Sequence, residues 1–336
     1  MSILPQNNLL FYQTLFIIKD MILVTGATGF IGQALIKQLL SQYHEVRLLI
    51  RPSRKTPSLP VGIPVEVAVA NLKDERGLRS ALNGIDIIYH LAGSERKGAY
   101  ASLLEDDIQG TQMITTIAKE AGVKRIIYLS HLGADRASAY PLLKAKAIAE
   151  EIVRRSGIEY TIIRSAVAYG PGDHFTLQFA RLAYLLPFVF PIPGDGQMKL
   201  QPIWINDLAL CLAWCLDIPA TINQTHEIGG GEYLSFETIM QKVLSAANIK
   251  RTFIHIYPSY LRLMVIFLEN SIPYFPISIF WLDYLAANRT CALDTLPRVF
   301  NLIPSLFDQH LAYLNQFSIL PLPSFLRKPK AKKKPR

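Results

Sequence analysis

Three glycines in one short stretch of this sequence have the spacing of a phosphate-binding turn. Gly26, Gly29 and Gly32 follow a short apolar run, Met21 to Val24, and precede apolar residues that recur at helical spacing. Glycine has no side chain, so the backbone can turn tightly and approach a phosphate, and the free N–H groups at the start of the next helix point at the negative charge. A strand, a glycine turn and a helix together predict a site for a dinucleotide pyrophosphate.

A tyrosine and a lysine form a second group that could do chemistry. Tyr140 and Lys144 stand four residues apart at the start of a predicted helix that runs to Arg155. This spacing places both side chains on one face of the helix, one turn apart. Because Pro141 is tolerated only in a first turn, the helix should begin near residues 138–140. Such a pair also arises often by chance, so its position among the other elements has to support a functional role.

The elements around these residues alternate between strand and helix. The predicted strands are Met21–Val24, Glu45–Ile50, Val65–Val69, Ile85–Leu91, Arg125–Ser130 and Glu159–Arg164. Helical patterns separate them, such as Gln109–Ala121, which Gly122 ends. This order predicts a doubly wound α/β fold, a parallel sheet with helices on both faces, and a smaller C-terminal α/β lobe. The tyrosine and lysine fall between the fifth and sixth strands.

The segment from Val24 to Gly32, V-T-G-A-T-G-F-I-G, resembles the fingerprint of the extended and atypical short-chain dehydrogenase/reductases, a group of NAD-dependent epimerase/dehydratase-like proteins. The resemblance runs from Met21 to about Ala247. Three further segments are most similar to the branch that includes the nucleotide-binding accessory subunit of respiratory complex I and its bacterial homologues: Gly122–Asp135, Arg164–Asp173 and Gln201–Asp207. NmrA-like proteins are similar more distantly. The resemblance implies a Rossmann-type fold.

The resemblance also implies which residues hold a nicotinamide nucleotide. They lie in the glycine turn, at later strand ends and on the helix after the fifth strand: Gly26, Thr28, Gly29, Phe30, Ile31, Gly32, Arg51, Asn71, Leu72, Ala92, Gly93, Ser130 and Lys144. Relatives usually carry Asp-Leu where this chain has Asn71-Leu72. In the family the lysine binds the nicotinamide ribose and lowers the pKa of the tyrosine, which then exchanges a proton with a carbonyl or alcohol. Tyr140 and Lys144 are therefore the candidate catalytic residues.

Arg51 closes the second predicted strand, where an NAD-preferring protein would carry an acidic residue that holds the ribose hydroxyls. An arginine instead suits the 2′-phosphate of NADP through charge-assisted hydrogen bonds. Arg54 and Lys55 follow closely, and the alternative interpretation is a solvated basic loop. The sequence favours NADP(H), with NAD(H) as the alternative.

One departure from the family pattern leaves two functions open. Catalytic extended members carry serine or threonine beyond the fifth strand, about where Leu132 falls, and leucine donates no hydrogen bond to a substrate. Ser130 and His131 are polar neighbours that spacing alone does not place. One hypothesis is an NADP(H)-binding oxidoreductase acting on an unknown carbonyl or hydroxyl compound. The other is a non-catalytic NAD(P)H-binding accessory subunit or redox sensor similar to the complex I protein.

Composition limits the partners and the compartment. Of the formal charge of +9, seven positive charges lie in the tail 327–336, which has no acid, so the body carries about +2 and no specific nucleic-acid partner is expected. The three cysteines have no metal-binding spacing. Cys211 and Cys215 lie one turn apart on a predicted apolar helix, which indicates reduced core thiols and a cytoplasmic protein.

We expect four segments. Residues 1–20 are an N-terminal extension, and residues 21–250 are the nucleotide-binding domain, which includes part of a substrate lobe from about residue 171. Residues 251–326 are an apolar helical region, and residues 327–336 are the basic tail. Each apolar run beyond residue 249 is shorter than the ~20 residues that span a bilayer. These runs either pack inside the lobe or form a surface for a protein complex or the inner face of a membrane.

Overall fold

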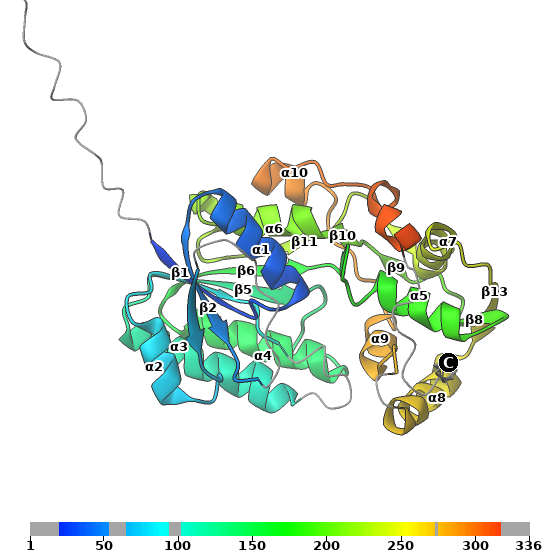
Figure 1. The fold of residues 1–336 in the computed structure, drawn as a ribbon, viewed down its shortest axis with the longest axis horizontal. Coiled ribbons are helices and arrows are strands. Elements are labelled where there is room, and N and C mark those ends of the chain that lie inside the picture. The colour runs from blue at the N-terminus through cyan, green and yellow to red at the C-terminus, as the bar shows by residue number, and fades with distance from the viewer. Residues whose placement is uncertain (1–19, 54–64, 94–101, 273–274, 317–336) are drawn as a thin grey trace, which may run out of the picture.

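The computed structural model describes residues 20–53, 65–93, 102–272 and 275–316. Seven parallel strands form the central sheet in the order β11-β6-β5-β4-β1-β2-β3 (Figure 1). Their bounds are β1 Met21–Thr25, β2 Glu45–Ile50, β3 Glu66–Val69, β4 Ile87–His90, β5 Arg125–His131, β6 Glu159–Ser165 and β11 Gln224–Ile228. The predicted doubly wound parallel sheet is confirmed. The strand order reverses between β1 and β4, so a crevice is expected at the carboxyl ends of these two strands.

Helices cover both faces of the sheet (Figure 1). One face carries α1 Phe30–Ser41, α6 Ile205–Trp214 and α10 Thr295–Phe300, and the other carries α2 Glu75–Leu82, α3 Gly110–Glu120 and α4 Pro141–Arg155. A π-helix, η2 Leu103–Gln109, leads into α3. Alternate residues of β1 serve the two cores: Ile22 and Val24 pack beneath α1 and α6, and Leu23 packs beneath α2 and α3. Burial on both faces explains why the central strands β1 and β4 are mostly apolar.

The smaller lobe contains four helices and three two-stranded pairs. The helices are α5 Thr176–Leu185, α7 Phe236–Ala246, α8 Pro258–Ser271 and α9 Ile279–Tyr284. The pairs are β7 Ala168–Tyr169 with β10 Ile203–Trp204, β8 Val189–Pro193 with β13 Thr252–Ile256, and β9 Lys199–Leu200 with β12 Leu234–Ser235. Among the described residues, the 3-10 turns η4 Phe307–His310 and η5 Ala312–Gln316 lie in this lobe, whereas η3 Pro219–Thr221 lies beside β11 of the central sheet. Aromatic side chains fill the lobe's core, where the Phe179 ring centroid lies 5.3 Å from Phe236 and 5.6 Å from Trp281.

The C-terminal region is divided between the two lobes. Helices α8 and α9 belong to the smaller lobe, whereas Leu296 and Phe300 of α10 pack into the core beneath α6. Cys211, Cys215 and Cys291 are free and buried. Among the described residues, no helix is long and apolar enough to cross a membrane. Residues 1–19, residues 54–55 and the basic tail lie outside the described residues, and the four segment boundaries stay predictions.

Candidate functional site

The glycine turn lies at the carboxyl end of β1, where the strand order reverses. The N–H group of Gly29 donates to the carbonyl oxygen of Gly26 at 2.9 Å, and α1 begins at the next residue. Gly26 has a φ of +70°, and a Cβ atom there would lie 2.8 Å from the backbone of Leu91. A Cβ atom on Gly32 would lie 2.3 Å from the Gly26 carbonyl oxygen. Close backbone packing therefore requires glycine at both positions.

This turn fits a pyrophosphate group. Gly29 is the N-cap residue of α1 and makes no side-chain capping bond, and Phe30, Ile31 and Gly32 line a cavity beside it. The N–H groups of a first helical turn have no acceptor inside the helix and carry partial positive charge. A phosphate in the cavity would accept hydrogen bonds from these groups.

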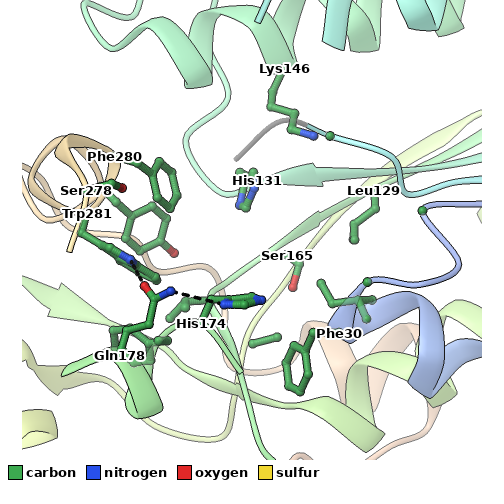
Figure 2. A pocket seen from close by; sticks show the side chains of 18 of the residues that line it. Phe30, Leu129, His131, Lys146, Ser165, His174, Gln178, Ser278, Phe280 and Trp281 are labelled. Atoms are coloured by element: carbon green, nitrogen blue, oxygen red, sulfur yellow. Dashed lines mark hydrogen bonds between the residues drawn. The ribbon is translucent and has the colours of Figure 1, made fainter. Parts of the chain in front are cut away.

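The cavity has a volume of about 590 Å³ and reaches from the glycine turn to α8 and α9 (Figure 2). Its inner part is lined by the turn and by the ends of β4, β5 and β6. Its outer part is lined largely by aromatic side chains of the smaller lobe: Phe175, Phe275, Phe280, Trp281 and Tyr284. The space is therefore larger than the glycine turn alone requires.

Seven of the predicted cofactor-binding residues line this cavity: Gly26, Gly29, Phe30, Ile31, Gly32, Gly93 and Ser130. Thr28, Arg51 and Asn71 are exposed instead. Leu72 is buried in the core between α2 and α3, and the N–H group of Ala92 donates to Thr25 Oγ1 at 3.2 Å. The roles of these five residues toward the nucleotide stay predictions.

The structure brings Lys146, rather than the predicted Tyr140 and Lys144, to the cavity. Tyr140 is the N-cap residue of α4, Lys144 is exposed, and neither is among the described residues that line the cavity. Two residues along an α-helix turn the side-chain direction by about 200°, so Lys146 points to the opposite side from Lys144. Four residues before Lys146 stands Leu142, which is buried. The catalytic roles of Tyr140 and Lys144 stay predictions that this geometry does not support.

Lys146 forms a buried ion pair beneath the cavity. Its Nζ lies 3.3 Å from Oδ1 of Asp107, and the two side chains are 3% and 0% exposed. Asp107 comes from the π-helix η2, a form of helix that often occurs at functional sites. The ammonium group also lies 5.7 Å from the ring centroid of Tyr128. The ion pair with Asp107 holds the buried Lys146 side chain at the cavity wall.

The side chains of Ser130 and Leu132 both make contacts inside the protein. The Ser130 hydroxyl donates to Oε1 of Glu150 at 2.6 Å, although the residue lines the cavity. Glu150 is fully buried and also accepts two hydrogen bonds from the guanidinium of Arg164, at 2.8 and 2.9 Å. Leu132 is 2% exposed and packs in the core beneath α1. Neither side chain is presented as a free hydrogen-bond donor to a substrate.

A buried hydrogen-bond chain supports the backbone under the cavity. Thr25 Oγ1 accepts from the Ala92 N–H group and lies 2.8 Å from His90 Nδ1. His90 Nε2 lies 3.0 Å from Thr111 Oγ1, whose hydroxyl donates to the carbonyl oxygen of Asp107. Thr111 therefore accepts from Nε2, and the neutral imidazole that burial favours accepts from the Thr25 hydroxyl at Nδ1. Burial, together with the charge of Lys146, lowers the pKa of His90 to about 3.

Comparison with known proteins agrees with this geometry. Residues 26–171 match a protein family described as NAD(P)H-binding. These residues are an NAD(P)H-binding domain. The glycine turn and the free N-terminus of α1 at one end of the cavity are features that suit the pyrophosphate of such a nucleotide.

Relatives of this chain include a complex I subunit and a reductase. The NADH dehydrogenase (ubiquinone) 1 alpha subcomplex subunit 9 of Arabidopsis thaliana is 28% identical over 295 residues, 81% of this chain and 70% of that protein. Ceramide reductase of Caulobacter vibrioides is 30% identical over 200 residues, 59% of this chain and 61% of that protein. The resemblance to the complex I accessory branch, predicted from the motifs, is confirmed.

A solved structure shares the fold of the whole described chain. The Escherichia coli NADPH-dependent quinone oxidoreductase QOR2, complexed with NADPH, has a TM-score of 0.70 at 20% identity. The match covers 88% of this chain and 99% of that one. This likeness shows that the chain has a Rossmann-type α/β fold.

Three residues that line the cavity were not predicted from the sequence: Leu129, Lys146 and Ser165. His131, which spacing alone did not place, also lines it. A signal for Lys146 was present, because the buried face of α4 repeats at helical spacing and carries two charged residues among apolar ones. That face consists of Leu142, Leu143, Lys146, Ala149, Glu150 and Val153. A charge on an otherwise apolar stripe indicates a buried partner or a functional site.

Proposed function

We propose that this protein is an NAD(P)H-dependent oxidoreductase that reduces a carbonyl compound to an alcohol. The outer part of the cavity supports this proposal. It adjoins the nucleotide end and is walled by Phe275, Phe280 and Trp281. A nucleotide held only for structural reasons needs no space beyond its nicotinamide, whereas a substrate needs an apolar chamber with a few polar groups next to it.

Two residues of this chain have proposed roles in the reaction. Lys146 holds the nicotinamide ribose, the role that the family resemblance implied for Lys144. His131 lies at the centre of the cavity, with its ring centroid 6.2 Å from Phe280 (Figure 2). Hydride for the carbonyl carbon would come from reduced nicotinamide when the nucleotide is bound. His131 gives a proton to the carbonyl oxygen, which completes the alcohol, and regains one from water.

Replacement of His131 by phenylalanine tests the proposed function. Phenylalanine preserves the ring contacts with Phe280 and Tyr284 but carries no proton. We expect kcat for NADPH oxidation with a reducible carbonyl compound to fall by about 10²–10⁴-fold, with the nucleotide Kd unchanged. Stopped-flow absorbance of the nicotinamide measures both. If the wild type turns over and His131→Phe has the same kcat, His131 has no role in the reaction. If the wild type turns over no carbonyl compound, the oxidoreductase proposal is refuted.

We further propose that the nucleotide is NADPH. Arg51 follows β2 directly and is exposed, and β2 is the neighbour of β1, which carries the glycine turn. Arg51→Ala should raise the Kd of NADPH by about 10–100-fold, the value of one or two hydrogen bonds to a charged group. The Kd of NADH should change less than about twofold. Nicotinamide fluorescence measures both, and Arg181→Ala, an exposed arginine on α5, is the matched control. Equal affinity for the two nucleotides in the wild type would contradict the preference.

A non-catalytic accessory subunit is the second candidate function. The outer face of α8 favours it, because Tyr260, Leu263 and Phe267 recur at helical spacing and are 67–69% exposed. A relative named as a complex I subunit suggests a protein complex as the partner. Tight NADPH binding without turnover would favour this function. In that case, Tyr260→Ser with Phe267→Ser should release the chain from the complex, as measured by native gel filtration.

A further inference from the structure

A second cavity of about 210 Å³, the apolar groove, lies between α8 and α5. Leu261, Met264, Val265 and Leu268 of α8 form one wall of this groove, and residues of α5, β8, α7, α9 and their flanking segments form the rest. Every described side chain that lines it is apolar. A groove with no polar group selects for hydrocarbon and against charged or hydrogen-bonding ligands.

The groove and the nucleotide cavity share two walls. Phe275 and Trp281 line both spaces. The indole N–H of Trp281 donates to Oε1 of Gln178 at 3.3 Å, which turns its polar edge toward the nucleotide cavity (Figure 2). The rest of its ring remains available to the apolar groove. Polar groups therefore gather on one side of this wall, and none lies on the other.

Helix α8 connects the two spaces along its length. Its middle lines the groove, and its last turn, with Glu269, Asn270 and Ser271, lines the nucleotide cavity. A ligand with a polar head and a long apolar chain would meet polar groups at one end and only hydrocarbon at the other. The arrangement of the lining residues matches that distribution of polarity.

We propose that the substrate is an amphipathic carbonyl compound with a long alkyl chain. The carbonyl group lies near His131 and Lys146, and the chain occupies the groove between α5 and α8. The proposal rests on the proposed oxidoreductase function for the reacting end. The alkyl-chain site itself rests only on the groove. Both can therefore be tested separately.

A homologous series of aldehydes from butanal to dodecanal tests the chain-length dependence. Each buried methylene contributes about 0.8 kcal/mol, so kcat/KM should rise about fourfold per carbon until the groove is full. Met264→Trp, which fills the groove from α8, should bring the plateau to a shorter chain. Leu263→Trp is the matched control, because this neighbouring residue is 67% exposed and does not line the groove.

Calorimetric titration of the full chain with 1-decanol and 1-butanol provides a readout that needs no turnover. We expect decanol to bind at least tenfold more tightly than butanol, and Met264→Trp, but not Leu263→Trp, to abolish the difference. Decanol binding without aldehyde reduction would support the alkyl-chain site and refute the oxidoreductase function. Aldehyde reduction that is independent of chain length, with equal binding of the two alcohols, would overturn the alkyl-chain site and leave the oxidoreductase function intact.

Discussion

Lys146→Met is expected to lower the free energy of unfolding by about 3–5 kcal/mol, because it leaves the Asp107 carboxylate buried without its cation. Methionine has nearly the length of lysine, so little packing volume is lost. The same variant should raise the Kd of NADPH by about 10–100-fold, since a charge-assisted hydrogen bond to the ribose is removed. Urea unfolding and nicotinamide fluorescence measure the two effects.

A double variant separates these two roles of Lys146. Asp107→Asn added to Lys146→Met removes the carboxylate charge that Lys146 balanced, and most of the lost stability should return. NADPH affinity should stay low, because the lysine that holds the ribose is still absent. Wild-type NADPH affinity in the stable double variant would show that Lys146 supports only the fold. Lys144→Met is the control, because Lys144 is exposed on the other side of the same helix.

Acid should destabilise this protein through His90. The pKa of His90 is about 3 in the folded chain and 6.5 in its ordinary state, so the unfolded chain binds more protons between these values. The contribution of His90 to the free energy of unfolding is therefore fully present above pH 6.5, and it is lost as the pH falls from 6.5 toward 3. From pH 7.5 to 5.5, this one residue should reduce the free energy of unfolding by about 1.4 kcal/mol.

Urea unfolding of wild type and His90→Asn at these two pH values tests the acid dependence. The variant should be less stable at pH 7.5, because hydrogen bonds to Thr25 and Thr111 are weakened. Between pH 7.5 and 5.5, the free energy of unfolding of the variant should fall by about 1.4 kcal/mol less than that of the wild type. The control variant is His226→Asn. His226 is half-buried, and burial also lowers its pKa. An identical pH dependence in wild type and His90→Asn would contradict a neutral, buried His90.

Local spacing was enough to predict the sheet and the nucleotide turn. The central strands β1 and β4 are mostly apolar because they are buried on both faces, and local patterns predicted six of the seven strands of the sheet. The spacing of the three glycines was enough to predict the turn, although the contact that requires glycine at position 26 is with the backbone of Leu91, which is distant in the chain. The cofactor class could therefore be predicted from local spacing.

Only the tertiary structure showed which lysine of α4 lines the cavity. Lys144 and Lys146 both lie on α4, and the sequence shows that they point in different directions without showing which direction meets the cavity. That direction is decided by the side of the helix that packs on the sheet, and by Asp107 of η2, which is 39 positions away in the chain.

The residues that form the outer part of the cavity lie even further from the motifs along the chain. Its walls come from α8, α9 and the segment between them, more than 90 residues beyond β6, and they meet β5 only because the smaller lobe folds back over the sheet. The sequence by itself determined a Rossmann-type domain and its nucleotide turn, because both depend on neighbours in the chain. Which lysine serves the cavity, and the apolar space beyond it, were decided by tertiary packing, because these contacts join segments whose separation no local pattern records.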